Sequence, residues 1–71
     1  MILAGDVGGT KILLEAGEFT SGRWRPALAR RYLLADYANM EQVLESFLAE
    51  WAQKRPPRAR LTAAAIGVAG P

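Results

Sequence analysis

The sequence contains no cysteine and no histidine. Without cysteine, the chain can have neither a disulfide framework nor a thiolate metal site. Without histidine, it lacks the usual base for a serine nucleophile, the commonest zinc ligand and the side chain that carries protons near neutral pH. Catalysis of the Ser-His type and His-ligated zinc are therefore excluded.

Long hydrophobic runs are also absent. Residues 1–4 are apolar but are followed almost at once by Asp6, and the apolar run at residues 61–68 is short as well. Neither run is long enough for the core of a secretory signal or for a membrane span. We therefore expect a soluble, cytoplasmic chain with no membrane partner.

The excess of charge of one sign is small, since nine basic and seven acidic residues give a net charge of +2. Arginines gather at residues 23–25, 30–31 and 55–60. They could contact phosphates while Trp24 stacks on a base, or they could be ordinary solvated charges of loops and strand edges. Because no nucleic-acid recognition motif accompanies them, we expect no nucleic-acid partner.

The amino-terminal half reads as three strands. The whole chain of 71 residues, 51% hydrophobic, suits one small domain with a modest core. Residues 2–5 predict a buried strand, a Gly-Gly-Thr break follows, and residues 11–16 return as the second strand of a hairpin. Residues 17–22 predict a turn that leaves Trp24 in a loop, and residues 27–34 predict a third strand at the sheet edge. In that strand Arg30 and Arg31 are expected to make one face polar.

The next segment predicts an amphipathic helix. Asn39 is a good N-cap and Gln42 stands in the capping-box position. Apolar residues then recur at helical spacing, and Trp51 among them is expected in the core. The stripe comprises Met40, Val43, Leu44, Phe47, Leu48, Trp51 and Ala52. Glu50 and Lys54 are spaced to pair, and residues 56–57, both proline, end the helix.

Residues 61–68 predict a last strand, parallel to an earlier one and covered on both faces. A helical alternative for residues 61–66 stays open, although the glycines that follow disfavour it. The predicted fold class is therefore α/β, with the order β-β-β-α-β in a mixed sheet with one crossover helix.

One motif carries chemistry: Asp6, Gly8, Gly9, Thr10 and Lys11 surround the first hairpin turn. Glycines reach backbone conformations denied to other residues and let another group approach closely, and successive amides can form an anion-binding concavity. Thr10 adds a hydroxyl donor and Lys11 a positive charge, and Asp6 can hold magnesium directly or through water. The alternative is a tight turn with no ligand. The motif is neither a Walker A loop nor a Rossmann fingerprint.

Residues 3–11 resemble the amino-terminal phosphate motif of bacterial glucokinases, in the sugar-kinase, Hsp70 and actin superfamily, to which the ROK group is related. Residues 36–41 resemble the segment that enters the family's first helix, and residues 65–71 its next strand and Ala-Gly-Pro turn. The resemblance implies part of a ribonuclease H-like (actin-like ATPase) domain. It also implies transfer of the γ-phosphoryl group of ATP to the 6-hydroxyl of glucose, with magnesium.

Carried over to this sequence, the resemblance implies that Asp6 orients magnesium and phosphate, chiefly through water. Gly8, Gly9 and Thr10 would line the phosphate turn, with Lys11 as a helper. The family's catalytic aspartate and its glucose and adenosine contacts lie beyond Pro71, so no catalytic residue is assigned here. Residues 1–71 are accordingly expected to be a partial amino-terminal domain that is inactive alone.

Two other functions stay open from the sequence. The chain could be a non-catalytic module that associates with itself through an exposed sheet edge. It could also be a fragment of another ROK-type sugar kinase or repressor, because the Gly-Gly-Thr motif alone specifies only the superfamily.

Overall fold

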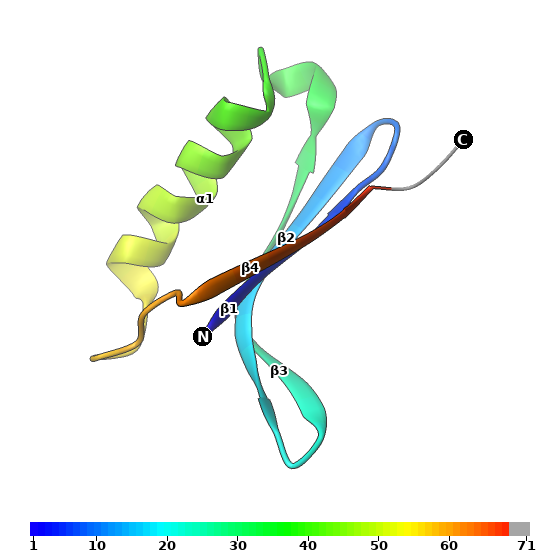
Figure 1. Cartoon of the computed structure of the whole chain (residues 1–71). Coiled ribbons are helices and arrows are strands. Elements are labelled where there is room, and N and C mark those ends of the chain that lie inside the picture. The colour runs from blue at the N-terminus through cyan, green and yellow to red at the C-terminus, as the bar shows by residue number, and fades with distance from the viewer. Residues whose placement is uncertain (69–71) are drawn as a thin grey trace.

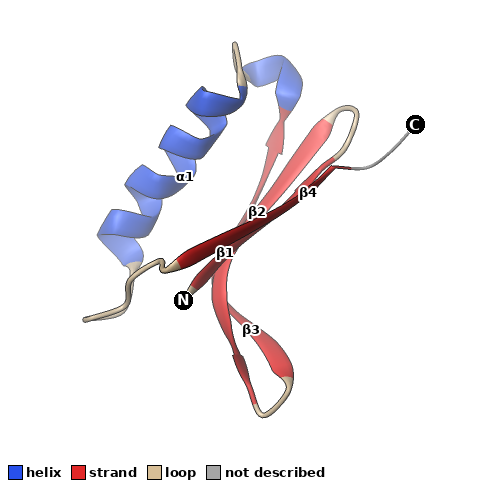
Figure 2. Cartoon of the chain, viewed as in Figure 1, coloured by secondary structure: helices blue, strands red, loops and turns tan. Residues whose placement is uncertain are grey.

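A computed structural model describes residues 1–68 as one sheet with a helix packed on it (Figures 1 and 2). The elements are β1 (Ile2–Val7), β2 (Lys11–Thr20), β3 (Arg23–Leu33), the short 3-10 helix η1 (Leu34–Asp36), α1 (Met40–Lys54) and β4 (Ala63–Val68). The predicted order β-β-β-α-β is confirmed. The resemblance in the Ala-Gly-Pro turn, residues 69–71, lies outside the described residues.

The four strands lie in the order β3-β2-β1-β4. β1 pairs antiparallel with β2, and β2 pairs antiparallel with β3. β4 returns after the helix and pairs with β1 in parallel, with Asp6 beside Gly67. The sheet is therefore mixed, as predicted, and the carboxyl ends of β1 and β4 lie at the same end of it.

The hairpin of β2 and β3 is longer than predicted. Its turn lies at Ser21 and Gly22, which have φ angles of 54° and 75°. Gly17 is part of β2, at a register shift opposite Pro26. Trp24 is in β3 and not in a loop, so that prediction was wrong. Pro26 lies in an edge strand and at the register shift, which are the places in a sheet where proline is tolerated.

The core lies between α1 and one face of the sheet. Its eight buried side chains are Leu3, Ile12, Leu14, Ala16, Leu28, Val43, Phe47 and Trp51. The helix contributes three of them at i, i+4 and i+8, and Trp51 lies in the core as predicted. Met40 and Leu44 of the predicted stripe pack against this core, whereas Leu48 and Ala52 are exposed.

The ends of α1 follow the predicted signals. The Gln42 amide donates to Asn39 Oδ1 at 3.0 Å, and Gln42 Oε1 accepts from the Ala38 amide at 2.9 Å. The second bond reaches one residue before the N-cap, so the capping box is a variant of the usual form. At the other end, the Arg55 amide donates to the Trp51 carbonyl at 2.8 Å before the two prolines.

β4 departs from its prediction, because all six of its residues are exposed. The strand was expected to be covered on both faces. In the structure it is the outermost strand, beyond β1, whereas the buried side chains under α1 come from β1, β2 and β3. Val68 is 75% exposed.

Within residues 1–68, no helix combines the length and the apolar character that crossing a membrane requires.

Candidate functional site

The turn between β1 and β2 is held from two sides. The Gly8 amide donates to the Lys11 carbonyl at 2.8 Å and closes the turn. The Thr10 carbonyl accepts from the Leu34 amide at 2.9 Å, where β3 passes into η1. The turn is therefore braced by a segment more than twenty residues further along the chain.

Two backbone donors in this turn remain available. The amides of Gly9 and Thr10 form no hydrogen bond with any residue of the described chain, and both residues are exposed. Successive amides with no protein acceptor can converge on an anion. The turn can therefore offer donors to a phosphate oxygen.

Gly8 and Gly9 differ in the space around them. Neither Gly8 nor Gly9 has a φ in the left-handed region, so the conformational freedom expected from the sequence is not what this turn uses. A Cβ at Gly9 would meet nothing within 4 Å, and one at Gly8 would lie 3.3 Å from the Lys11 carbonyl oxygen. The open space above Gly9 is room for a ligand to approach the backbone.

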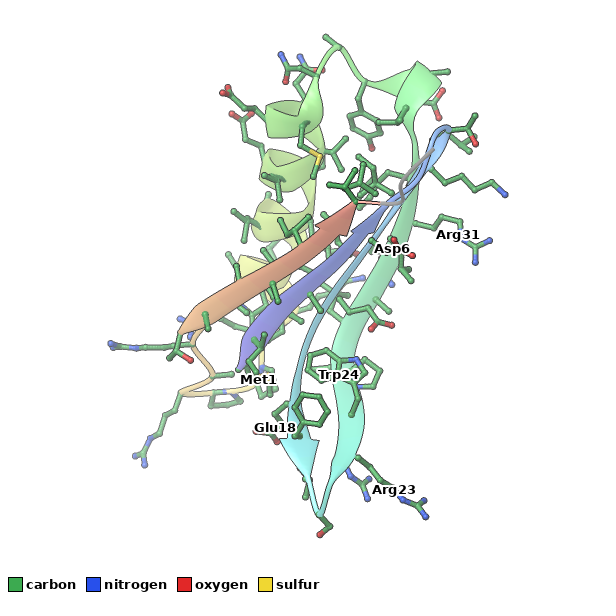
Figure 3. The ribbon with its side chains drawn as sticks, turned by 45° about the vertical axis from the view of Figure 1, so that its right-hand side comes forward. Met1, Asp6, Glu18, Arg23, Trp24 and Arg31 are labelled. Carbon is green, nitrogen blue, oxygen red and sulfur yellow. The ribbon has the colours of Figure 1, made fainter. Side chains whose placement is uncertain are left out.

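Asp6 is the one exposed residue of β1 and lies on the sheet face opposite α1 (Figure 3). Its side chain forms no hydrogen bond or ion pair within residues 1–68. It lines two neighbouring hollows. One, of about 130 Å³, is formed with Ala4, Gly5, Leu13 and Glu15, and the other, of about 300 Å³, with Gly8, Lys11, Leu13 and Arg31.

The donor set fits magnesium only through water and phosphate. No group of three or more acidic, histidine or cysteine side chains gathers anywhere in residues 1–68. Asp6 alone offers one free carboxylate next to the turn. Magnesium usually keeps several waters and takes one or two carboxylates, with substrate phosphates completing its shell. The residues present therefore fit an ion that arrives with a phosphate chain.

The larger hollow brings together predicted and unpredicted residues. Asp6, Gly8 and Lys11 were candidates from the sequence, and the structure places all three around it. Arg31 lines it too and was not predicted. Arg30 and Arg31 were expected to share a polar face, but consecutive residues of a strand point to opposite faces, and Arg30 faces the helix. Strand alternation with the correct register would have identified Arg31.

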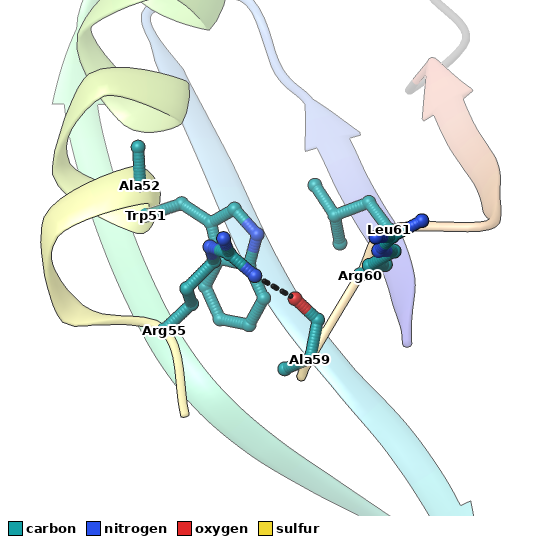
Figure 4. A pocket seen from close by; sticks show the side chains of 6 residues that line it. All are labelled: Trp51, Ala52, Arg55, Ala59, Arg60 and Leu61. Carbon is teal, nitrogen blue, oxygen red and sulfur yellow. Dashed lines mark hydrogen bonds between the residues drawn. The ribbon is translucent and has the colours of Figure 1, made fainter. Parts of the chain in front are cut away.

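A separate hollow of about 270 Å³ lies beneath the end of α1 (Figure 4). It is lined by Trp51, Ala52, Arg55, Ala59, Arg60 and Leu61. Arg55 Nη1 donates to the Ala59 carbonyl at 2.7 Å across its mouth. It adjoins the amino-terminal ends of β1 and β4, because the Met1 amino group donates to the Arg60 carbonyl there. It is therefore remote from the phosphate turn.

A comparison with models of protein families matches residues 3–71 to the model described as glucokinase. The chain belongs to the glucokinase family. The match includes the whole of the turn, with Asp6 and Lys11 on either side of it. A comparison with curated proteins finds no match.

The fold is also that of a larger solved protein. This glucokinase-family chain is similar to the crystal structure of the Aquifex aeolicus member of the Ppx/GppA protein family, with a TM-score of 0.57 and 11% identity. The likeness covers 94% of this chain and 25% of that one. It shows the fold alone, which is part of an actin-like ATPase fold, α/β with a mixed sheet, as predicted. The chain spans about a quarter of the length of that structure.

Proposed function

We propose that the chain is the amino-terminal, phosphate-binding part of an ATP-dependent glucokinase. The whole enzyme would transfer the γ-phosphoryl group of ATP to the 6-hydroxyl of glucose in the cytoplasm. The observation that carries the proposal is the turn itself, where two amides with no acceptor among residues 1–68 adjoin an exposed carboxylate. The match to the glucokinase family supports the reaction and the substrates.

Each site residue has a distinct role in this proposal. The amides of Gly9 and Thr10 donate to phosphate oxygens, and Gly8 keeps the approach clear. Asp6 accepts hydrogen bonds from water around magnesium, and Lys11 adds a positive charge. Bound magnesium would neutralise charge on the phosphates. Phosphoryl transfer depends mainly on positioning and electrostatic stabilisation, which a braced backbone turn can supply.

The 71-residue chain is proposed to be a partial domain that binds phosphate but does not turn over substrate. None of its residues has been assigned as the base that takes the proton of the sugar hydroxyl. A coupled assay of glucose-dependent ADP formation by the purified chain tests this. We expect no turnover above the protein-free control, and turnover would contradict the assignment.

Gly9→Ala tests the phosphate turn directly. The methyl group would occupy the open space over the turn without touching the protein, so the fold should be unchanged. Hydrogen bonds to charged groups are worth about 1.5–3 kcal/mol, so loss of one should weaken MgATP binding about tenfold or more. Calorimetric titration measures the binding, and thermal unfolding checks the fold. Binding equal to wild type in a folded variant would contradict the proposal.

The exposed β4 favours a second function, self-association. Ala63–Val68 carries no charge and no proline, and its outer backbone groups are unpaired in the described sheet. The opposite edge, β3, carries Arg23, Arg25 and Arg31 together with Pro26, which discourage strand addition. We propose that a second copy pairs with β4. Light scattering over a range of concentrations tests this, and a monomer throughout would contradict it.

A further inference from the structure

We propose that Arg31 is an additional phosphate-binding residue of this site, on the strand next to that of Lys11. This inference rests on the proposed function, because it assigns Arg31 to the same ligand as the turn. The ligand class is a magnesium-bound phosphate chain, such as that of a nucleoside triphosphate.

The register of the sheet places Arg31 beside the turn. Asp6 is paired with Leu13 on β2, and Leu13 is paired with Arg31 on β3. The three residues therefore form one row across three strands. Lys11 lies two residues before Leu13, so strand alternation puts it on the same face. All four line the hollow of about 300 Å³ next to Gly8.

Arg31 has no side-chain partner among residues 1–68. It is exposed, and it forms no ion pair or side-chain hydrogen bond with the described part of the chain. Its neighbour Arg30 differs, since Arg30 Nε and Nη2 both donate to Glu50 at 2.8 Å on the helix side. Arg30 therefore ties the helix to the sheet, whereas the Arg31 guanidinium is available to a ligand.

The combination of charges selects the ligand. Two cations would attract any anion, but the Asp6 carboxylate, which lines the same hollow, would repel an anion that carries no metal. A phosphate chain with magnesium satisfies all three groups, because phosphate oxygens accept from the cations and the carboxylate accepts from water on the metal. The planar guanidinium can donate to two phosphate oxygens at once. Leu13 forms an apolar floor between these groups.

The position of Arg31 also implies where the chain of phosphates runs. The turn amides lie at the end of the sheet, and Arg31 lies on the neighbouring strand (Figure 3). A ligand held by both must cross the face of β2 above Leu13. The Arg31 row lies two residues further from the turn than Lys11, so the inference concerns a ligand of two or more linked phosphates.

Titration of the 71-residue chain with magnesium and inorganic tripolyphosphate tests the inference. The variants are Arg31→Ala, the conservative Arg31→Lys, and Arg23→Ala as the matched control. Arg23 is an exposed arginine of the same strand at its far end (Figure 3). We expect Arg31→Ala to weaken binding about tenfold and Arg31→Lys to weaken it less. Arg23→Ala should bind as wild type does.

Each of the other possible results contradicts either the role of Arg31 or the proposed function. Equal binding by wild type and Arg31→Ala removes Arg31 from the site but leaves the turn as a phosphate site. Equal weakening by Arg31→Ala and Arg23→Ala shows only general attraction to a basic strand and also overturns the inference. No binding by wild type contradicts the proposed function itself. The titration is repeated with MgATP to distinguish a nucleotide from a free phosphate chain. Binding of tripolyphosphate without any binding of MgATP would exclude a nucleotide as the ligand.

Discussion

At the scale of single residues, the glycines of this chain serve different purposes. A Cβ at Gly17 would collide with the Arg25 carbonyl oxygen and lie 2.9 Å from Pro26 Cα, so this glycine allows two backbones to approach at the register shift. A Cβ at Gly9 would meet nothing within 4 Å. Gly17 is therefore required by the fold, whereas the fold does not require a glycine at position 9.

This contrast gives a stability prediction. Gly17→Ala should destabilise the chain by about 1–3 kcal/mol, because backbone must shift to admit the methyl group. Gly9→Ala should leave stability nearly unchanged. For a domain of this size each kcal/mol lowers the melting temperature by about 4–8 °C, which circular dichroism resolves. Equal melting temperatures for the two variants would contradict the assigned roles.

At the scale of elements, Glu50 joins α1 to β3. Its carboxylate accepts from Arg30 Nε and from Lys54 Nζ, at 2.8 Å in each case. Hydrogen bonds from Arg30 and then Lys54 lower the pKa of Glu50 from 4.5 to about 2. The same contact raises the pKa of Arg30, while burial raises that of Tyr32. The contact between α1 and β3 through Glu50 and Arg30 is therefore weakened by acid.

The sign of the pH dependence follows from the lowered pKa. The contact contributes its full stability above pH 4.5, and this contribution is lost as the pH falls toward 2, because the unfolded state binds the proton first. Between these values, the free energy of unfolding should fall more steeply in wild type than in Glu50→Gln. Denaturant titrations at several pH values measure it. Glu45→Gln, at an exposed acid of the same helix, should keep the wild-type slope, and parallel curves for Glu50→Gln would contradict the prediction.

The elements also show what local sequence can predict. The start and end of α1 were predicted because the N-cap and the prolines act within a few residues of the chain. The length of β2 and β3 was not predicted. Gly17 lies at a register shift, and in the sequence such a glycine resembles a turn glycine until its partner strand is known. The ion pair of Arg30 with Glu50 joins residues twenty apart and has no local signature.

The candidate site likewise contains residues that the local sequence identifies and one that only the fold brings in. Asp6 through Lys11 are contiguous, so the motif could be seen in the sequence and its residues stay together in the fold. Arg31 reaches the same hollow only through the pairing of three strands. A sequence without the register cannot assign it to the turn. What holds the turn in place, the bond from Leu34 to Thr10, is equally non-local.

At the scale of the whole molecule, the two edges of the sheet are unequal, and this asymmetry supplies the last prediction. Association through β4 should be blocked by Ala65→Lys, because the new charge lies at the middle of the exposed strand and would approach the same residue of a second copy. Ala29→Lys is the matched control, an exposed alanine of the already charged β3. Light scattering should show a mass that rises with concentration for wild type and Ala29→Lys but stays monomeric for Ala65→Lys. Association of Ala65→Lys to the wild-type extent would rule out β4 as the contact, whereas loss of association in both variants would point to a general effect of added charge.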